Sequence, residues 1–167
     1  MLVDASPLIY LAKLDALDVF ARAGHVPLVT PQVERETARP GLAYRFPDAV
    51  SIGDALRDRV LTRIILSEDE RADAGRLAAS ARGIHPGESE VLAVATGRDI
   101  PVLLYERRAL RLARSLGLDT WSPIRLLVEG TPDPAQLRDR IVGFARLVEL
   151  RYGEVDELLR ALEGNRP

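Results

Sequence analysis

The chain has 167 residues, of which 47% are hydrophobic, and its formal net charge is −2. This length is enough for one domain with a sizeable core. The absence of cysteine excludes disulfides, thiolate nucleophiles and zinc–thiolate sites, and the small net charge provides no general attraction for nucleic acid. Because every hydrophobic run is shorter than the roughly 20 residues that cross a bilayer, we expect a cytoplasmic protein without a membrane segment.

Strands and helices are predicted to alternate through the first 125 residues. Short apolar runs predict strands at residues 1–3, 25–29, 60–66, 100–105 and 118–121. Apolar residues at helical spacing predict helices at residues 7–23, 31–38, 47–59, 67–82, from 86 onward, 106–116 and from 122 onward. The first helix has Ser6 as its expected cap and a candidate break near Asp15. Thr30 and Ser122, each followed by proline, give the same cap signal for two later helices, and Ser67 to Glu70 form a capping box. This alternation predicts an α/β fold of three layers, with a mostly parallel central sheet of about five strands between helices.

The pattern changes at the segment Thr-Pro-Asp-Pro, residues 131–134. Two further helices are predicted, at residues 134–151 and 153–162, and the first carries the apolar stripe Leu137, Ile141, Phe144 and Val148. We therefore predict a main domain over residues 1–130 and a helical extension over residues 131–167 that packs on it. An alternative is that the stripe forms a dimer or partner surface.

Four carboxylates are predicted to meet at one edge of the sheet. Asp4 follows the first strand, Glu36 lies in the helix after the second strand, Glu88 lies in the first turn of a helix, and Glu106 follows the fourth strand. The carboxyl ends of parallel strands share one edge, where ligands bind. Carboxylates gathered there repel one another unless a cation is bound, and Mg²⁺ and Mn²⁺ prefer oxygen ligands. Two such ions would clamp a phosphodiester for in-line displacement.

Each acid also has a structural alternative. Asp4 is placed to cap the following helix. Glu88 and Glu106 stand at helix N-termini, where the helix dipole favours acids in any case. Glu36 competes with Glu34, which lies two positions earlier on another face of the same predicted helix.

The acids stand in four segments, VDASPLI at residues 3–9, TPQVERE at 30–36, GESEVLAVA at 87–95 and LLYERRALRLA at 103–113. These segments resemble the PIN-domain family, a metal-dependent ribonuclease fold that includes the VapC-type toxins of toxin–antitoxin pairs. The resemblance covers about residues 1–125. The Gly-Glu-x-Glu helix and the Glu-Arg-Arg turn are its most specific parts and are most similar to a prokaryotic subgroup. The expected fold is therefore PIN-like.

The resemblance implies a catalytic set of Asp4, Glu36, Glu88 and Glu106. Asp4, Glu88 and Glu106 would hold Mg²⁺ or Mn²⁺, while Glu36 would hold a second ion or orient water. Ser6 would brace a metal-bound water or a phosphate. The implied activity is endonucleolytic cleavage of single-stranded RNA to a 5′-phosphate and a 3′-hydroxyl, and the implied partners are RNA, an antitoxin-like protein and a second copy of the chain.

Residues beside the acids are given supporting roles. Glu90 is placed to support Glu88, and Arg107 and Arg108 are candidates for gripping an RNA backbone, because guanidinium groups match phosphates. A solvated helix face is the alternative for these arginines.

The subgroup usually has a pair of acids after the fourth strand, and Tyr105 replaces the first of them. This departure favours a rival interpretation, in which the PIN-like scaffold is a catalytically weakened module that binds RNA or protein.

Overall fold

The computed structural model describes residues 1–39, 45–80 and 83–150. Its strands are β1 (Leu2–Val3), β2 (Leu28–Val29), β3 (Thr62–Arg63), β4 (Val102–Leu103) and β5 (Thr120–Trp121). Its helices are α1 (Ala5–Lys13), α2 (Val19–Arg22), α3 (Pro31–Thr37), α5 (Pro47–Arg57), α6 (Glu68–Ser80), α7 (Pro86–Arg98), α8 (Arg107–Ser115), α9 (Pro123–Gly130) and α10 (Pro134–Leu147). The helix predicted at residues 153–162 lies outside the described residues.

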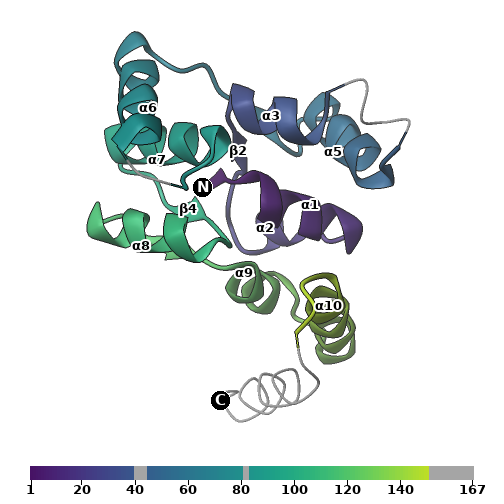
Figure 1. Cartoon of the computed structure of the whole chain (residues 1–167). Coiled ribbons are helices and arrows are strands. Elements are labelled where there is room, and N and C mark those ends of the chain that lie inside the picture. The colour runs from purple at the N-terminus through teal and green to yellow at the C-terminus, as the bar shows by residue number, and fades with distance from the viewer. Residues whose placement is uncertain (40–44, 81–82, 151–167) are drawn as a thin grey trace.

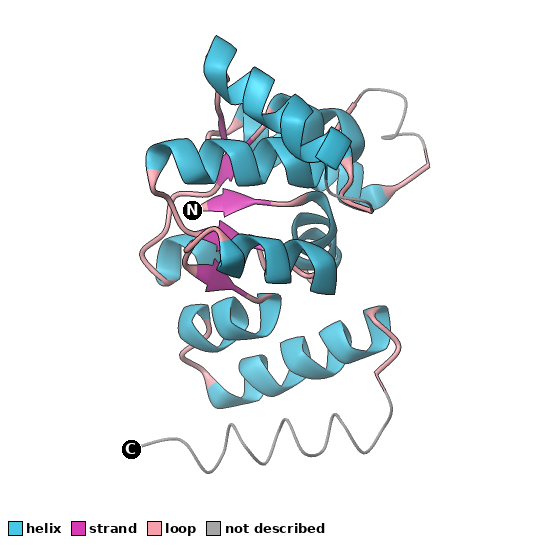
Figure 2. Cartoon of the chain, turned by 60° about the vertical axis from the view of Figure 1, so that its left-hand side comes forward, coloured by secondary structure: helices cyan, strands magenta, loops and turns pink. Residues whose placement is uncertain are grey.

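All five strands pair in parallel, in the order β3-β2-β1-β4-β5. The chain runs from β1 outward to β3 and then crosses back, so that β4 pairs with the other side of β1. Figure 2 shows this sheet enclosed by helices. The predicted α/β fold is therefore confirmed, and the sheet is wholly parallel. The order of its strands reverses between β1 and β4, which is where ligands bind in open parallel sheets.

Local signals placed most helix starts correctly. Thr30 caps α3 by accepting a hydrogen bond from the Val33 N–H at 3.3 Å, and Ser122 caps α9 by accepting one from the Arg125 N–H at 3.2 Å. Both caps are followed by proline in the first helical turn, where its missing N–H costs nothing.

The first predicted helix starts earlier than expected and breaks where the sequence indicated. It begins at Ala5 with Asp4 as its N-cap, rather than with Ser6 as the cap, because the chain turns into the helix directly after β1. It also ends early, since Asp15 adopts a left-handed backbone with φ 48° and the chain then starts α2 separately. The candidate break near Asp15 is therefore confirmed.

Buried apolar side chains of the strands and of the helices packed around them, from Met1 to Phe144, form one core. Helix α7 packs on β1 and β4, and α2 packs on α9. In Figure 1, α10 lies beside α9. Leu137, Ile141 and Phe144 of its predicted stripe are buried in the same core, which supports the covering interpretation for these residues. None of the helices in the described ranges is long and apolar enough to span a membrane.

The predicted capping box at the start of α6 also connects α6 to α7. The Ser67 N–H donates to Glu70 Oε2 at 2.7 Å, and the Glu70 N–H donates to Ser67 Oγ at 3.1 Å. Arg98 of α7 donates to both Glu70 oxygens, at 2.6 and 2.9 Å. These donors, Arg98 foremost, lower the pKa of the buried Glu70 carboxyl to about 2.

We expect Glu70→Gln to lower the free energy of unfolding by about 2 kcal/mol at pH 7, because the exposed Arg98 loses an ionised partner that is itself buried. A depressed folded-state pKa stabilises the fold above the unfolded value of 4.5, and that stabilisation is lost as the pH falls toward 2. Urea unfolding at pH 7 and pH 3 measures both effects. The exposed Glu68→Gln serves as the control and should change stability little. An equal loss for Glu70→Gln at both pH values would contradict this account.

Candidate active site

Asp4 lies at the reversal point of the sheet, directly after the central strand β1. Its backbone N–H donates to the Leu103 carbonyl of β4 at 3.1 Å, and its side chain makes no capping hydrogen bond to α1. The residue is 3% exposed. The carboxylate is therefore held in the interior, beside the Ala5 N–H at the start of α1.

The surroundings of Asp4 are unfavourable for its charge. Burial is the main cause that raises the pKa of its carboxyl from 3.8 to about 7, and Glu88, Glu36 and Glu106 add to the rise, while the Ala5 N–H opposes it. All three acids lie on other elements of the fold. The three other predicted carboxylates therefore lie close enough to Asp4 for their charges to raise its pKa.

Glu88 is buried in the first turn of α7. Its Oε2 accepts a hydrogen bond from the His85 N–H at 2.8 Å, so the residue does cap its own helix. Burial raises the pKa of the Glu88 carboxyl, and Glu106 and Glu36 add to that rise. Glu88 therefore combines the structural role that its helix position suggested with membership of the acidic group.

Glu106 is the N-cap residue of α8, and its exposed side chain makes no capping hydrogen bond. It contributes to the raised pKa of both Asp4 and Glu88. The carboxylate of Glu106 therefore faces these two buried acids at the rim of the site without being used by its own helix.

Glu36 is an exposed residue of α3 whose carboxylate lies against the start of α7. A Cβ atom added to Gly87 would stand 2.7 Å from Glu36 Oε2. The other oxygen of Glu36, Oε1, accepts a hydrogen bond from Gln32 Nε2 at 2.7 Å. Its competitor Glu34 accepts a hydrogen bond from Arg63 Nε at 2.8 Å instead. The structure thus places Glu36, rather than Glu34, beside Glu88.

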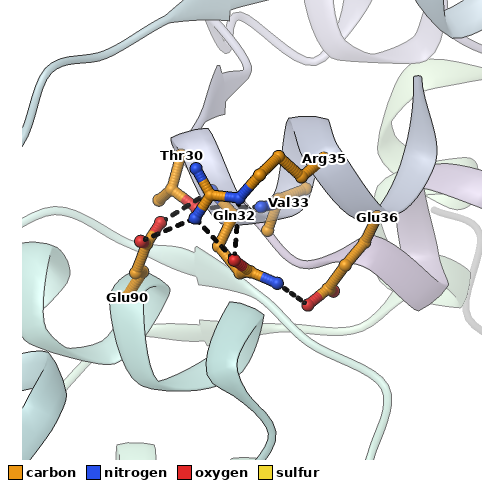
Figure 3. A network of polar contacts seen from close by, with 6 residues as sticks. All are labelled: Thr30, Gln32, Val33, Arg35, Glu36 and Glu90. Carbon is orange, nitrogen blue, oxygen red and sulfur yellow. Dashed lines mark hydrogen bonds and ion pairs between the residues drawn. The ribbon is translucent and has the colours of Figure 1, made fainter. Parts of the chain in front are cut away.

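Glu90 contacts α3 rather than Glu88. Its Oε2 accepts a hydrogen bond from the Gln32 N–H at 2.8 Å, and its Oε1 lies 3.7 Å from Arg35 Nη2 (Figure 3). Ser6 is a partly buried residue in the first turn of α1, next to Ala5 and Asp4. The supporting roles of Glu90 and Ser6 stay predictions. The residues that Glu90 contacts belong to α3, the helix that carries Glu36.

The acidic cluster, defined as Asp4, Glu36, Glu88 and Glu106, has two buried members and two exposed ones. In the part of the chain that the structure describes, no three such side chains converge as a ready-made metal site. Hydrogen bonds explain in part why the four carboxylates do not converge, because the Gln32 amide donates to Glu36 and the His85 N–H donates to Glu88. The donor set fits Mg²⁺ or Mn²⁺, since it consists of carboxylate oxygens whose charges oppose one another.

A cavity of about 700 Å³ adjoins the cluster. Glu88 and Glu106 line it, together with Arg107, Arg108 and Arg111 from α8. His85 and Ser122 also line this cavity, and neither had a predicted role. In the sequence, His85 and Ser122 each precede a proline at a helix start, and this pattern predicts a helix cap but not a position in a cavity. Acids and arginines thus share one wall, an arrangement that suits a phosphate bound beside a cation.

Tyr105 belongs to a cluster of three aromatic rings. Its ring meets Tyr10 edge-on at 5.3 Å between centroids and Phe144 at 5.8 Å, and Tyr10 meets Phe144 at 5.7 Å. Burial raises the pKa of the Tyr105 hydroxyl, and Glu106 raises it further. The residue that replaces the expected acid therefore joins α1 and α10 beside the site.

Fold and site together define a class of protein, an α/β domain with acidic residues gathered where the strand order of a parallel sheet reverses. The family model DUF3368, described as a PIN domain, matches residues 1–132, and the chain belongs to this family. PIN domains are generally nucleases, hydrolases of nucleic acids that typically bind divalent metal ions. No curated protein and no solved structure matches the chain.

Proposed function

We propose that this chain is a Mg²⁺- or Mn²⁺-dependent endoribonuclease that cleaves single-stranded RNA. The observation that carries the proposal is the buried Asp4, whose pKa is raised to about 7 by burial and by acids on three other elements. Isolated buried charge is costly, and a strongly perturbed carboxyl at a ligand-binding edge of a sheet is a mark of functional sites. A divalent cation would stabilise the ionised form of all four acids at once.

Asp4, Glu88 and Glu106 would hold the ion, because the first two are buried and the third faces them without a capping duty. The ion would supply Lewis acidity toward the phosphodiester and a more acidic water. Glu36, at the exposed rim, would orient the attacking water and accept its proton, or hold a second ion. In-line attack on phosphorus would leave a 5′-phosphate and a 3′-hydroxyl.

Arg107 and Arg108 would bind the RNA backbone. They occupy the first turn of α8, directly after Glu106, and line the cavity beside the acids. Guanidinium groups form paired, charge-assisted hydrogen bonds to phosphate oxygens. Ser6, in the first turn of α1 and two residues after Asp4, would brace a water or a phosphate oxygen.

The more specific role that we propose is that of a toxin in a toxin–antitoxin pair. It rests on the resemblance of the four acidic segments to the VapC-type toxins. An antitoxin-like protein would then be a partner, with a homodimer as the expected assembly. A small antitoxin-like reading frame beside the gene would support this role, and size-exclusion chromatography of the two proteins together would test it.

Tyr105 favours a second candidate function, a binding module with weakened catalysis. Its ring packs on Tyr10 and Phe144 in the place where an acid is expected. Such a module would retain RNA binding through the arginines of α8 and lose turnover.

The test is incubation of end-labelled single-stranded RNA with the protein and Mn²⁺ or Mg²⁺, with a parallel sample in chelator. We expect internal cleavage that requires metal and yields fragments with 5′-phosphates. A gel-shift assay in chelator measures RNA binding separately. RNA that is bound but never cut, with any divalent ion, would overturn the enzyme and establish the binding module.

A further inference from the structure

Four polar residues form one continuous chain of contacts from α7 to the acidic cluster (Figure 3). Glu90 accepts a hydrogen bond from the backbone of Gln32 and faces Arg35. Arg35 Nε donates to the side-chain oxygen of Gln32 at 3.0 Å. The Gln32 amide nitrogen then donates to Glu36 at 2.7 Å. Gln32 is therefore the link between an ion pair and a member of the acidic cluster.

The chemistry of arginine determines which way the Gln32 amide faces. A guanidinium group has only donors, so the Gln32 atom beside Arg35 must be the oxygen. The amide nitrogen must then face Glu36, where it is a donor to a carboxylate. Without Arg35, the amide would be free to rotate about its last side-chain bond, and that orientation would no longer be enforced.

The held carboxylate lies in a space that only glycine leaves open. With Oε1 bound to Gln32, the Oε2 atom of Glu36 lies over Gly87, 2.7 Å from where a Cβ would stand. The next residue of α7 is Glu88, a buried member of the cluster. Gln32 and Gly87 thus determine together where the exposed acid Glu36 meets the buried one.

We propose that Gln32, oriented by Arg35, is a positioning residue that holds the Glu36 carboxylate beside Glu88 for divalent cation binding. This inference rests on the proposed function and takes the alternative there in which Glu36 holds a divalent ion. It adds two residues, Gln32 and Arg35, that do not themselves touch the ion.

The first test is Gln32→Met, which keeps a long helix-forming side chain and removes the amide. We expect the Mn²⁺ concentration that gives half the maximal thermal stabilisation to rise about tenfold. Loss of a hydrogen-bond partner of a metal ligand typically weakens metal binding by about 10- to 100-fold, and the lower value is expected here because the contact between Gln32 and Glu36 is exposed. The melting temperature without metal should stay nearly unchanged. RNA cleavage should fall at limiting Mn²⁺ and recover at saturating Mn²⁺.

A second variant, Gly87→Ala, displaces Glu36 without touching Gln32. The three atoms nearest to the added Cβ all belong to the end of the flexible Glu36 side chain, so the fold should tolerate it, while the Mn²⁺ midpoint should rise as it does for Gln32→Met. Gly75→Ala in α6 is the matched control, because its Cβ would meet nothing within 4 Å. Both variants gain helix propensity, and only Gly87→Ala should change the Mn²⁺ response.

A double-mutant cycle decides whether Gln32 acts through Glu36. In a Glu36→Gln background, Gln32→Met should have no further effect on the Mn²⁺ midpoint. Glu34→Gln breaks an ion pair on another face of α3 and should leave the midpoint unchanged. A wild-type midpoint in Gln32→Met, or equal effects of Gln32→Met in both backgrounds, would overturn the positioning role alone. A wild-type protein that no divalent ion stabilises would overturn the proposed function and the inference with it.

Discussion

Asp4→Asn is expected to abolish metal-dependent RNA cleavage while making the metal-free protein more stable. Because loss of even an outer partner of a metal ligand costs up to about 100-fold, we expect cleavage by this variant to fall by at least about 100-fold. The change removes a buried carboxylate next to three others and leaves a side chain of nearly the same shape. Activity and stability should therefore change in opposite directions, as residues that serve function rather than folding do.

The stability gain has a definite pH dependence. A carboxyl whose pKa is raised from 3.8 to about 7 destabilises the fold when it is ionised, so the cost is complete above pH 7 and disappears as the pH falls toward 3.8. At pH 8 we expect Asp4→Asn to stabilise the metal-free protein by about 2–3 kcal/mol, less than the full shift because the buried amide also loses solvation. At pH 4 the two proteins should have nearly equal stability. Chemical denaturation in chelator at both pH values measures this difference.

Added Mn²⁺ should reverse the order of stability. A ligand that binds only the folded protein stabilises it by mass action, so wild type should gain stability with Mn²⁺ and Asp4→Asn should gain little. Asp15→Asn, at an exposed residue in the turn after α1, is the control and should respond to Mn²⁺ as wild type does. If Asp4→Asn were less stable than wild type at pH 8, or responded equally to Mn²⁺, then Asp4 would be a structural residue.

Phe144→Ala is expected to lower the free energy of unfolding by about 3–4 kcal/mol, the usual cost of deleting a buried aromatic ring. Phe144 is 1% exposed and its ring contacts both Tyr10 and Tyr105 edge-on. The cost would show that α10 is part of the main core rather than an appendage. Phe144→Leu, which keeps most of the volume, should cost less than about 1.5 kcal/mol.

Urea unfolding of the two Phe144 variants distinguishes the two interpretations of the C-terminal helices. A loss below about 1 kcal/mol for Phe144→Ala, typical of surface positions, would mean that the face of α10 is available to a partner. Loss of the ring should also loosen Tyr105 beside Glu106, so the variant reports on the aromatic cluster as well as on the helix.

Much of the fold was predictable from neighbouring residues. Each strand of the structure lies within a predicted range, although it is shorter than predicted. The capping residues Thr30 and Ser122, and the capping box of Ser67 and Glu70, depend on local backbone chemistry, and the structure confirms them. The segment before α1 was predicted wrongly, because Ser6 and Pro7 read as a cap although Asp4 already turns the chain.

The detail of the site was less predictable, because it depends on residues far apart in the chain. Glu34 and Glu36 lie on one helix and could not be separated by sequence. Arg63, 29 residues beyond Glu34, pairs with that carboxylate, while Glu36 lies over Gly87. The partner of Glu90 was likewise decided by a hydrogen bond that spans 58 residues.

By itself, the sequence determined the α/β alternation, most of the caps, and the positions of Asp4, Glu88 and Glu106 at a strand end or a helix start, since periodicity and capping act between residues a few positions apart. Tertiary structure alone decided which acids are buried, which carboxylate oxygens are already bonded, and that Tyr105 packs on Tyr10 and Phe144. The reason is physical: the direction and the charge of a carboxylate depend on its nearest partners in space, and here those partners come from different elements of the fold.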